Sequence, residues 1–430
     1  MAQILARLED YHVSSTSGFL PSSPPLESLL DPYYTPWESI ISVLPCLIRD
    51  GSLRERVAVL PLLETEILST EEEWRRAYVI LGYLCNGYIF SRFPPTETLP
   101  LCLSRPMIEV STHLGLPPVP TYSGQTLWNH RFCGKADGLI HSNSIQTLAS
   151  FTGSPEESSF FGISVAIEAC GAPLIPALLS GIEAASQQDW VALEVCLQKA
   201  EGILNNMTTL LPTLYQSCSP EFFYTTLRPF LEGTKDLASV GLPNGVFFEE
   251  KDGGSCRKYC GPSNAQSSLF VLVDIALGVN HSTSSHRSGH TNASFGQQEI
   301  LAAKTQFLDD MRWYMPRGHR RFLNEVERVS NIKAAIRSNS HNLQLREAYH
   351  DCLAALAQFR QKHIQMVTRY VVVMAKQNCN TSKERSKGDE LESGGAAKPV
   401  SVAGANGTGG TRPIAFLKSV RDDVLCAAQD

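Results

Sequence analysis

The feature that most constrains this fold is an apolar stripe in the stretch 345–373, LREAYHDCLAALAQFRQKHIQMVTRYVVV. Its apolar and aromatic residues recur alternately four and three positions apart, the spacing that lines one face of an α-helix. His363 lies in the middle of this stripe, between Phe359 and Met366. A histidine on a buried face needs a hydrogen-bond partner, a metal or a cofactor, because burying it unpartnered is unfavourable. The spacing leaves two interpretations open, a ligand histidine and a core histidine satisfied by a backbone carbonyl.

The same periodicity through most of the chain predicts an all-α fold. The stretch 71–91 is acidic at its start and apolar through its middle, as expected of a helix whose dipole favours negative charge at its N-terminus. The stretch 266–279 is almost wholly apolar, which predicts a buried helix. Strand-like alternation is nearly absent, and the best candidate for a strand is the short run 246–248.

A chain of 430 residues is long enough for two domains. We expect a small helical N-terminal domain over 1–120, a connecting segment over 121–150 and a large helical domain over 151–430. The stretches 281–297 and 380–412 are rich in glycine and serine and are predicted to be mobile insertions.

Histidines at 281, 286 and 290 raise the question of a metal site in the first insertion. No acidic residue or cysteine lies close to them in the sequence. The pattern therefore favours a solvated loop over a metal site.

Composition excludes several classes of protein. Lys and Arg number 37 against 43 Asp and Glu, a net charge of −6, whereas nucleic-acid-binding proteins usually carry basic patches. The N-terminus has no apolar signal region. The sequence also contains no run of about 18 apolar residues, the length that would predict a membrane span. The 12 cysteines are scattered without a disulfide or zinc spacing. These features predict a cytoplasmic protein, and we expect a monomer.

Six stretches, taken together and in this order, resemble the indoleamine 2,3-dioxygenase family, the haem enzymes that open the pyrrole ring of tryptophan. The resemblance runs from about residue 122 to the C-terminus, and more loosely through the first 120 residues. The stretches are FFGISVAIEA (160–169), FFYTTLRPFLEG (222–233), GPSNAQSSLFVLVDIALGV (261–279), FLDDMRWYMPRGHRRFL (307–323), LREAYHDCLAALAQFRQKHIQMVTRY (345–370) and GTGGT (407–411).

The resemblance implies a b-type haem enclosed by the larger helical domain. By position, His363 resembles the proximal ligand of the haem iron. Arg360 resembles an arginine at the haem edge beside a propionate, the alternative being an exposed helix arginine. Asp274 is implied as an electrostatic or water-mediated partner of the ligand, the alternative being a carboxylate paired with an arginine. Ser263 is implied to lie near a propionate and the amino group of the substrate.

On the substrate side, the resemblance implies a pocket with aromatic residues around the indole and polar residues at the substrate carboxylate. Phe160 and Ser164 are spaced i, i+4 and so face the same way on one helix. Arg228 is implied to hold the substrate carboxylate, a task that suits its planar fork of donors. The remaining implied substrate contacts are Tyr122, Phe223, Ser263 and Thr408, the last within the GTGGT loop.

The implied reaction inserts O2 across the indole C2–C3 bond of L-tryptophan and yields N-formyl-L-kynurenine, the first step of the kynurenine route to NAD. The alternative is a haem protein of the same fold that binds oxygen with little or no dioxygenase activity. Tyr224 stands where vertebrate members commonly carry phenylalanine, and Thr225 and Thr226 are more polar than usual. The sequence therefore predicts a substrate pocket that differs in size or polarity.

Overall fold

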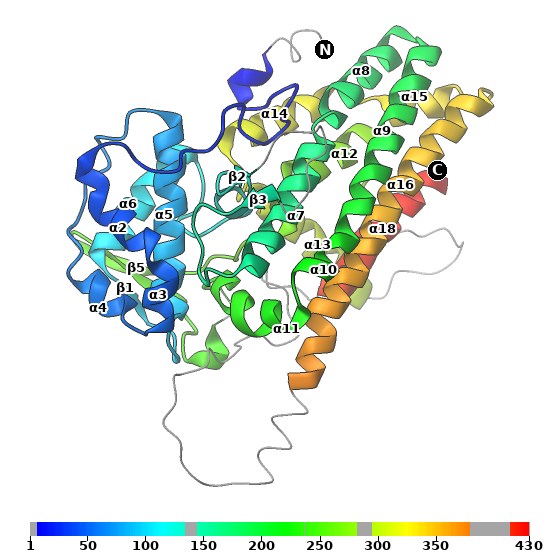
Figure 1. The fold of residues 1–430 in the computed structure, drawn as a ribbon. Coiled ribbons are helices and arrows are strands. Elements are labelled where there is room, and N and C mark those ends of the chain that lie inside the picture. Colours follow the sequence, from blue (N-terminus) through cyan, green and yellow to red (C-terminus); the bar gives the residue numbers. More distant parts are fainter. Residues whose placement is uncertain (1–6, 134–143, 236, 282–294, 379–412, 430) are drawn as a thin grey trace.

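The computed structural model describes residues 7–133, 144–235, 237–281, 295–378 and 413–429. These residues form a mostly helical protein with a few short strands (Figure 1), which confirms the all-α prediction. The predicted insertions lie almost wholly outside the described residues, and so does Thr408.

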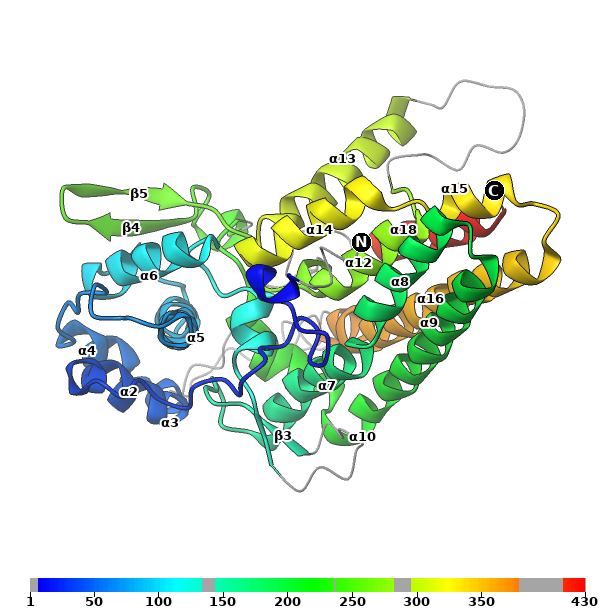
Figure 2. The same ribbon diagram turned by 90° about the horizontal axis from the view of Figure 1, so that it is seen from above.

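The N-terminal helices gather around α5 on one side of the molecule (Figures 1 and 2). This helix starts at a capping box, in which Thr70 and Glu73 satisfy each other's backbone N–H groups. Most of α5 beyond its first turn is buried, as its apolar sequence predicts. The helices of this group are α2 (Thr35–Ser42), α3 (Leu44–Arg49), α4 (Leu53–Ala58), α5 (Glu71–Phe90) and α6 (Leu101–Leu114).

A small sheet joins distant parts of the sequence. The predicted strand at 246–248 is confirmed as part of β4 (Val246–Glu250), which forms a hairpin with β5 (Gly253–Arg257). β4 also pairs in parallel with β1 (Thr98–Leu99) and packs against α6. This hairpin, from beyond residue 150, thus lies beside the N-terminal helices (Figure 2). The division into domains at residues 120 and 150 stays a prediction.

Long helices form the rest of the molecule, with α9 (Trp190–Leu210) packed between α8 (Leu174–Gln187) and α16 (Leu343–Val367) (Figure 1). The predicted stripe on α16 is confirmed, and it continues into a π-helical turn, η10 (Thr368–Val373). The buried residues of the stripe are Leu345, Tyr349, Cys352, Leu356, Phe359, Met366 and Tyr370.

Further helices and strands complete the described chain. The helices are α7 (Pro155–Gly171), α10 (Leu214–Ser217), α11 (Pro220–Phe222), α12 (Ser268–Leu277), α13 (Phe295–Arg312), α14 (Arg317–Val329), α15 (Ile332–Ser338) and α18 (Pro413–Gln429). Short turns of π- or 3-10 helix are η1 (Leu8–Tyr11), η2 (Pro32–Tyr34), η3 (Ser123–Leu127), η5 (Leu211–Thr213), η6 (Phe223–Leu227), η7 (Arg228–Leu231), η8 (Ala238–Val240) and η9 (Asn264–Gln266). A second strand pair joins β2 (Arg131–Phe132) and β3 (Ile145–Gln146).

One stretch, Pro155–Gln187, is long and apolar enough to cross a membrane by length and composition, contrary to the expectation from the sequence. It comprises α7 and α8, and 72% of its most apolar window is buried inside the protein. A mostly buried core helix passes the same test, so this stretch is weak support for a membrane span.

Candidate functional site

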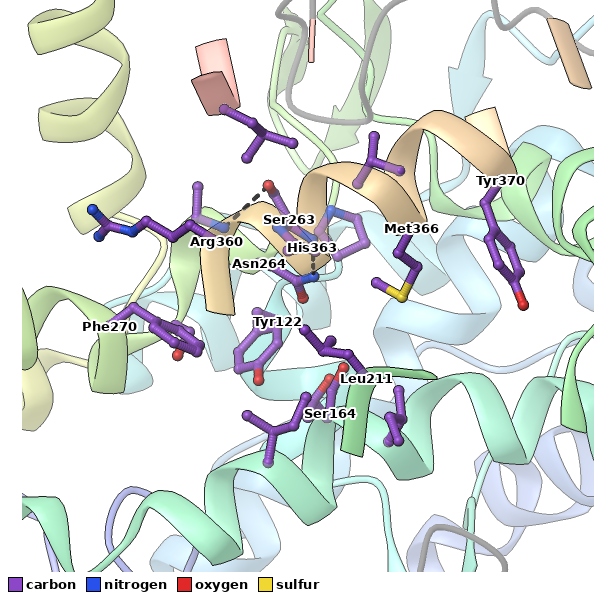
Figure 3. Close-up of a pocket in the computed structure, with 18 of the residues that line it drawn as sticks. Tyr122, Ser164, Leu211, Ser263, Asn264, Phe270, Arg360, His363, Met366 and Tyr370 are labelled. Atoms are coloured by element: carbon purple, nitrogen blue, oxygen red, sulfur yellow. Dashed lines mark hydrogen bonds between the residues drawn. The ribbon is translucent and has the colours of Figure 1, made fainter. Parts of the chain in front are cut away.

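A cavity of about 280 Å³ lies between α16 and α7 (Figure 3). It is close to the size of known small-molecule sites, which begin at roughly 300 Å³. The structure brings together at this cavity every predicted site residue except Thr408, which lies outside the described residues. The predicted residues that line it are Tyr122, Phe160, Ser164, Phe223, Arg228, Ser263, Asp274, Arg360 and His363.

His363 projects from α16 into this cavity (Figure 3). The side-chain amide of Asn264 donates a hydrogen bond to its Nε2 atom at 3.2 Å. The Nε2 atom therefore carries a lone pair that faces the cavity. Burial, together with the charge of Arg360, lowers the pKa of His363 to about 4. The imidazole is thus neutral near pH 7, the form in which histidine binds a metal.

The surroundings of His363 restrict the kind of metal site. Among the described residues, no group of three or more histidine, cysteine, aspartate or glutamate side chains is arranged to hold a metal ion. A metal at His363 must therefore bring most of its ligands with it, as the iron of a porphyrin does. The partner of His363 is a side-chain amide, so the alternative of a core histidine bound to a backbone carbonyl is wrong.

Arg360, one turn before His363, forms an ion pair with Asp274 of α12. Its guanidinium donates to both carboxylate oxygens at 2.6 Å and to the carbonyl oxygen of Val420 at 3.0 Å. Its side chain is 11% exposed, so the alternative of an exposed arginine is wrong. The alternative for Asp274, a carboxylate paired with an arginine, is confirmed. Contact of Arg360 with a propionate stays a prediction.

A chain of charges continues from Asp274 to the last described helix. His281 lies between two carboxylates, with Nε2 3.0 Å from Asp274 and Nδ1 2.7 Å from Asp423 of α18. Lys304 of α13 binds Asp423 in turn at 2.8 Å. The prediction that His281 belongs to a solvated loop is therefore wrong. The sequence pattern could not indicate Asp423 as a partner, because it follows His281 by more than 100 residues.

The position of His281 between two carboxylates is expected to make the stability of the protein depend on pH. Burial alone would lower the pKa of His281, but the facing charge of Asp274 and the hydrogen bonds to Asp274 and Asp423 outweigh burial and raise it. A raised pKa adds stability that is complete below the ordinary value of 6.5 and is lost as the pH rises through the raised value. We expect the native protein to exceed His281→Gln in unfolding free energy by about 1–2 kcal/mol at low pH.

Thermal denaturation of both proteins between about pH 5.5 and 9 would measure this difference. The gap should shrink steadily as the pH rises. The exposed His341 provides a control, because His341→Gln removes an imidazole that lies between no such pair of carboxylates. A gap that widened towards high pH would contradict the assignment of a protonated His281.

Three aromatic side chains pack against one another and line the cavity together with His363. Phe160 of α7 stacks on Phe223 with ring centroids 4.6 Å apart, and Tyr370 meets Phe223 edge-on at 5.8 Å. Ser164 (Figure 3) follows Phe160 by one turn of α7, and both side chains line the cavity as the i, i+4 spacing predicts. Such a wall suits a flat aromatic ligand.

Arg228 places a buried cation at the edge of this wall. Its side chain is 2% exposed, its guanidinium lies over the ring of Tyr224 at 5.3 Å, and Glu232 approaches it at 3.6 Å. The polar residue Tyr224, which departs from the family pattern, is thus part of the arginine's surroundings. A buried guanidinium beside an apolar cavity is suited to binding a carboxylate.

The structure also adds a polar cluster that the sequence pattern did not indicate. Glu168, one turn beyond Ser164, accepts hydrogen bonds from the hydroxyl groups of Tyr122 at 3.0 Å and Ser267 at 2.7 Å. Burial raises the pKa of Glu168 to about 7, although both hydrogen bonds oppose the shift. The sequence feature that could have indicated this cluster is Glu168 itself, a lone carboxylate within the apolar run 160–169.

Comparison with known proteins agrees with this site. The profile of the family described as indoleamine 2,3-dioxygenase matches residues 7–426. A 6-hydroxytryptophan 2,3-dioxygenase of Fusarium equiseti is 52% identical over 429 residues, which cover 100% of both chains. Indoleamine 2,3-dioxygenases of Penicillium citrinum and Saccharomyces cerevisiae are 36% and 34% identical, over 98% of this chain and over 88% and 93% of theirs. The chain has a helical fold and a cavity lined by a neutral histidine and aromatic side chains. These matches show that it belongs to the indoleamine 2,3-dioxygenase family.

Proposed function

We propose that this protein is a haem dioxygenase that adds both atoms of O2 across the indole C2–C3 bond of a tryptophan and yields an N-formylkynurenine. The observation that carries the proposal is the neutral His363, whose Nε2 faces a cavity that also contains an aromatic pair and a buried arginine. Family membership supports the reaction class.

The residues at the cavity fit a haem. His363 offers one nitrogen ligand, and among the described residues no group of three metal-ligating side chains surrounds it, so a macrocycle would supply the other ligands. Asn264 would turn away from Nε2 when the iron binds there. Apolar side chains such as Phe270, Met366 and Val367 line the cavity near His363 and suit a flat, largely apolar ring. When bound, the haem supplies the redox-active iron that the reaction of O2 with an indole requires.

The protein's own side chains would bind and orient the substrate. Arg228 would hold its carboxylate, while Phe160 and Phe223 would pack on the indole. Ser164 would lie near the indole nitrogen or O2. We propose Thr408 as a further contact to the carboxylate. Binding in this cavity would restrict the orientation of the indole, which favours a single reaction course.

The names of the relatives suggest two candidate substrates, tryptophan and 6-hydroxytryptophan. The relatives from Penicillium citrinum and Saccharomyces cerevisiae are named for indoleamines, whereas the relative from Fusarium equiseti is named for 6-hydroxytryptophan. We propose a tryptophan, with or without a ring hydroxyl, as the substrate class. With L-tryptophan itself, the product would enter the kynurenine route to NAD.

We further propose that the protein is a monomer and that it is located in the cytoplasm.

The test is a reaction of the ferrous, haem-loaded protein with isotopically labelled O2 and either L-tryptophan or 6-hydroxy-L-tryptophan. We expect a product that carries two labelled oxygen atoms, detected by mass spectrometry, together with N-formylkynurenine-type absorbance. Reversible O2 binding without product from either substrate would instead favour the alternative, an oxygen-binding protein of the same fold.

A further inference from the structure

We propose that Gln125, the neighbour of Thr126 on the turn η3, recognises a hydroxyl group on the benzene ring of the indole, so that a ring-hydroxylated tryptophan is the preferred substrate. This inference rests on the proposed dioxygenase function and specifies its substrate. It concerns the part of the cavity formed by η3, which none of the predicted site residues occupies.

The π-helical turn η3 places both residues in the cavity wall. It packs against α5 and α7, and α7 carries Phe160 and Ser164. Gln125 and Thr126 line the same cavity as these two residues, and they are only 1% and 2% exposed. A polar side chain buried to this degree is uncommon unless its hydrogen bonds are satisfied.

The side-chain amide nitrogen of Gln125 has no such partner among the described residues. Its Nε2 atom is buried and makes no hydrogen bond. A primary amide carries two N–H donors, and leaving them unsatisfied in the interior is unfavourable. An amide in this state at a cavity wall points to a hydrogen-bond acceptor on the molecule that fills the cavity.

Neighbouring polar groups at the cavity have hydrogen-bond partners within the protein. The hydroxyl groups of Tyr122 and Ser267 also belong to residues of the cavity wall, but both donate to Glu168. They are therefore held by the protein itself. The Gln125 amide nitrogen, in contrast, has no hydrogen-bond partner among the described residues.

The chemistry of the indole limits which ligand group can satisfy this donor. The ring nitrogen of an unsubstituted indole is a donor only, so it cannot accept a hydrogen bond from Nε2. The carboxylate is already assigned to Arg228. A hydroxyl on the benzene ring both accepts and donates, and therefore matches both ends of a primary amide. The 52% identity to a 6-hydroxytryptophan 2,3-dioxygenase supports this choice independently.

The size of the expected preference follows from general experience with specificity. A site built to hydrogen-bond a substrate hydroxyl disfavours the analogue without it, by up to about 10⁴–10⁵-fold, because its own polar groups are left unpaired. Here a single neutral amide is involved, so we expect kcat/KM for 6-hydroxytryptophan to exceed that for tryptophan by about 10-fold or more.

The experiment compares the haem-loaded native enzyme with Gln125→Leu, using L-tryptophan, 6-hydroxy-L-tryptophan and 6-methyl-L-tryptophan. For each pair, kcat/KM and the dissociation constant, from the substrate-induced change in haem absorbance, are measured. Gln125→Leu should abolish the preference for the hydroxylated substrate by weakening its binding about 10-fold, while tryptophan is affected little. The methyl compound, which has similar bulk but no acceptor, should behave like tryptophan.

Ser123→Ala is the matched control. Ser123 lies on the same turn and its buried hydroxyl also has no partner among the described residues, but it does not line the cavity. This variant should keep the native ratio between the substrates. A purely structural role for Gln125 would lower activity on both substrates equally.

Equal kcat/KM values for tryptophan and its hydroxylated form in the native enzyme would overturn the inference and leave the dioxygenase function standing. An unchanged ratio in Gln125→Leu would overturn it as well. Absence of turnover with every substrate would refute the dioxygenase function, and the ratio of dissociation constants would still decide the role of Gln125.

Discussion

Replacing His363 with alanine is expected to remove most of the bound haem. The imidazole is the one nitrogen donor among the described cavity residues with a lone pair that faces the cavity, and its lowered pKa keeps it neutral. Without it, the haem would be held only by apolar contacts and the polar side chains at its edge. We expect haem content, measured by pyridine haemochrome absorbance, to fall at least about 10-fold, because loss of a ligand commonly costs several kcal/mol.

The control lies on the same helix. His350 is half-buried on α16, two turns or more from the cavity, and does not line it. His350→Ala should retain native haem content, which separates ligand loss from disturbance of the helix. Exogenous imidazole should restore haem to His363→Gly by occupying the vacated space. Native haem content in His363→Ala would show that another side chain holds the iron.

Replacing Arg228 with alanine should produce the second large effect, a loss of substrate affinity with haem retained. Removing one partner of a buried, hydrogen-bonded ion pair costs about 2–5 kcal/mol, or roughly 30-fold to several thousand-fold in an equilibrium constant. We expect kcat/KM for any tryptophan substrate to fall at least about 100-fold, mainly through KM. Steady-state kinetics on protein with verified haem content would measure the change.

Two further variants define the origin of that loss. Arg228→Lys keeps the charge but loses the planar fork, so it should recover only part of the affinity. Arg369 also lies over a tyrosine ring, Tyr215, at 4.6 Å, but it is exposed and does not line the cavity. Arg369→Ala should therefore leave KM unchanged. Unchanged KM in Arg228→Ala would remove this arginine from the substrate site.

The helices of this protein were predictable because their signal is local. The stripe through Phe359 and Met366 repeats at the helical period, and each of its apolar members is buried in the structure. The i, i+4 pair Phe160 and Ser164 likewise faces the cavity as its spacing requires. The resemblance then supplied roles for residues that spacing alone left open, above all His363.

Polar contacts between distant segments were not predictable in the same way. The histidine at 281 meets carboxylates at 274 and 423, and no periodic pattern links these positions. The pairing of β1 with β4 joins strands separated by more than 140 residues, and β1 is only two residues long. Gln125 lies in a π-helical turn, which has no sequence signature in a single chain. Each of these features depends on the assembled fold.

The position of α18 has a consequence for any shortened form of the protein. Phe416, Leu417 and Val420 of this helix line the cavity, although His363 precedes them by more than 50 residues. A fragment that ends before residue 413 contains His363, both stacked phenylalanines and Arg228, yet its cavity lacks one wall. During synthesis on the ribosome, the cavity is likewise incomplete until α18 has been made. A haem bound as proposed would be enclosed only after that point, and a deletion far from the substrate contacts would then leave it open to water.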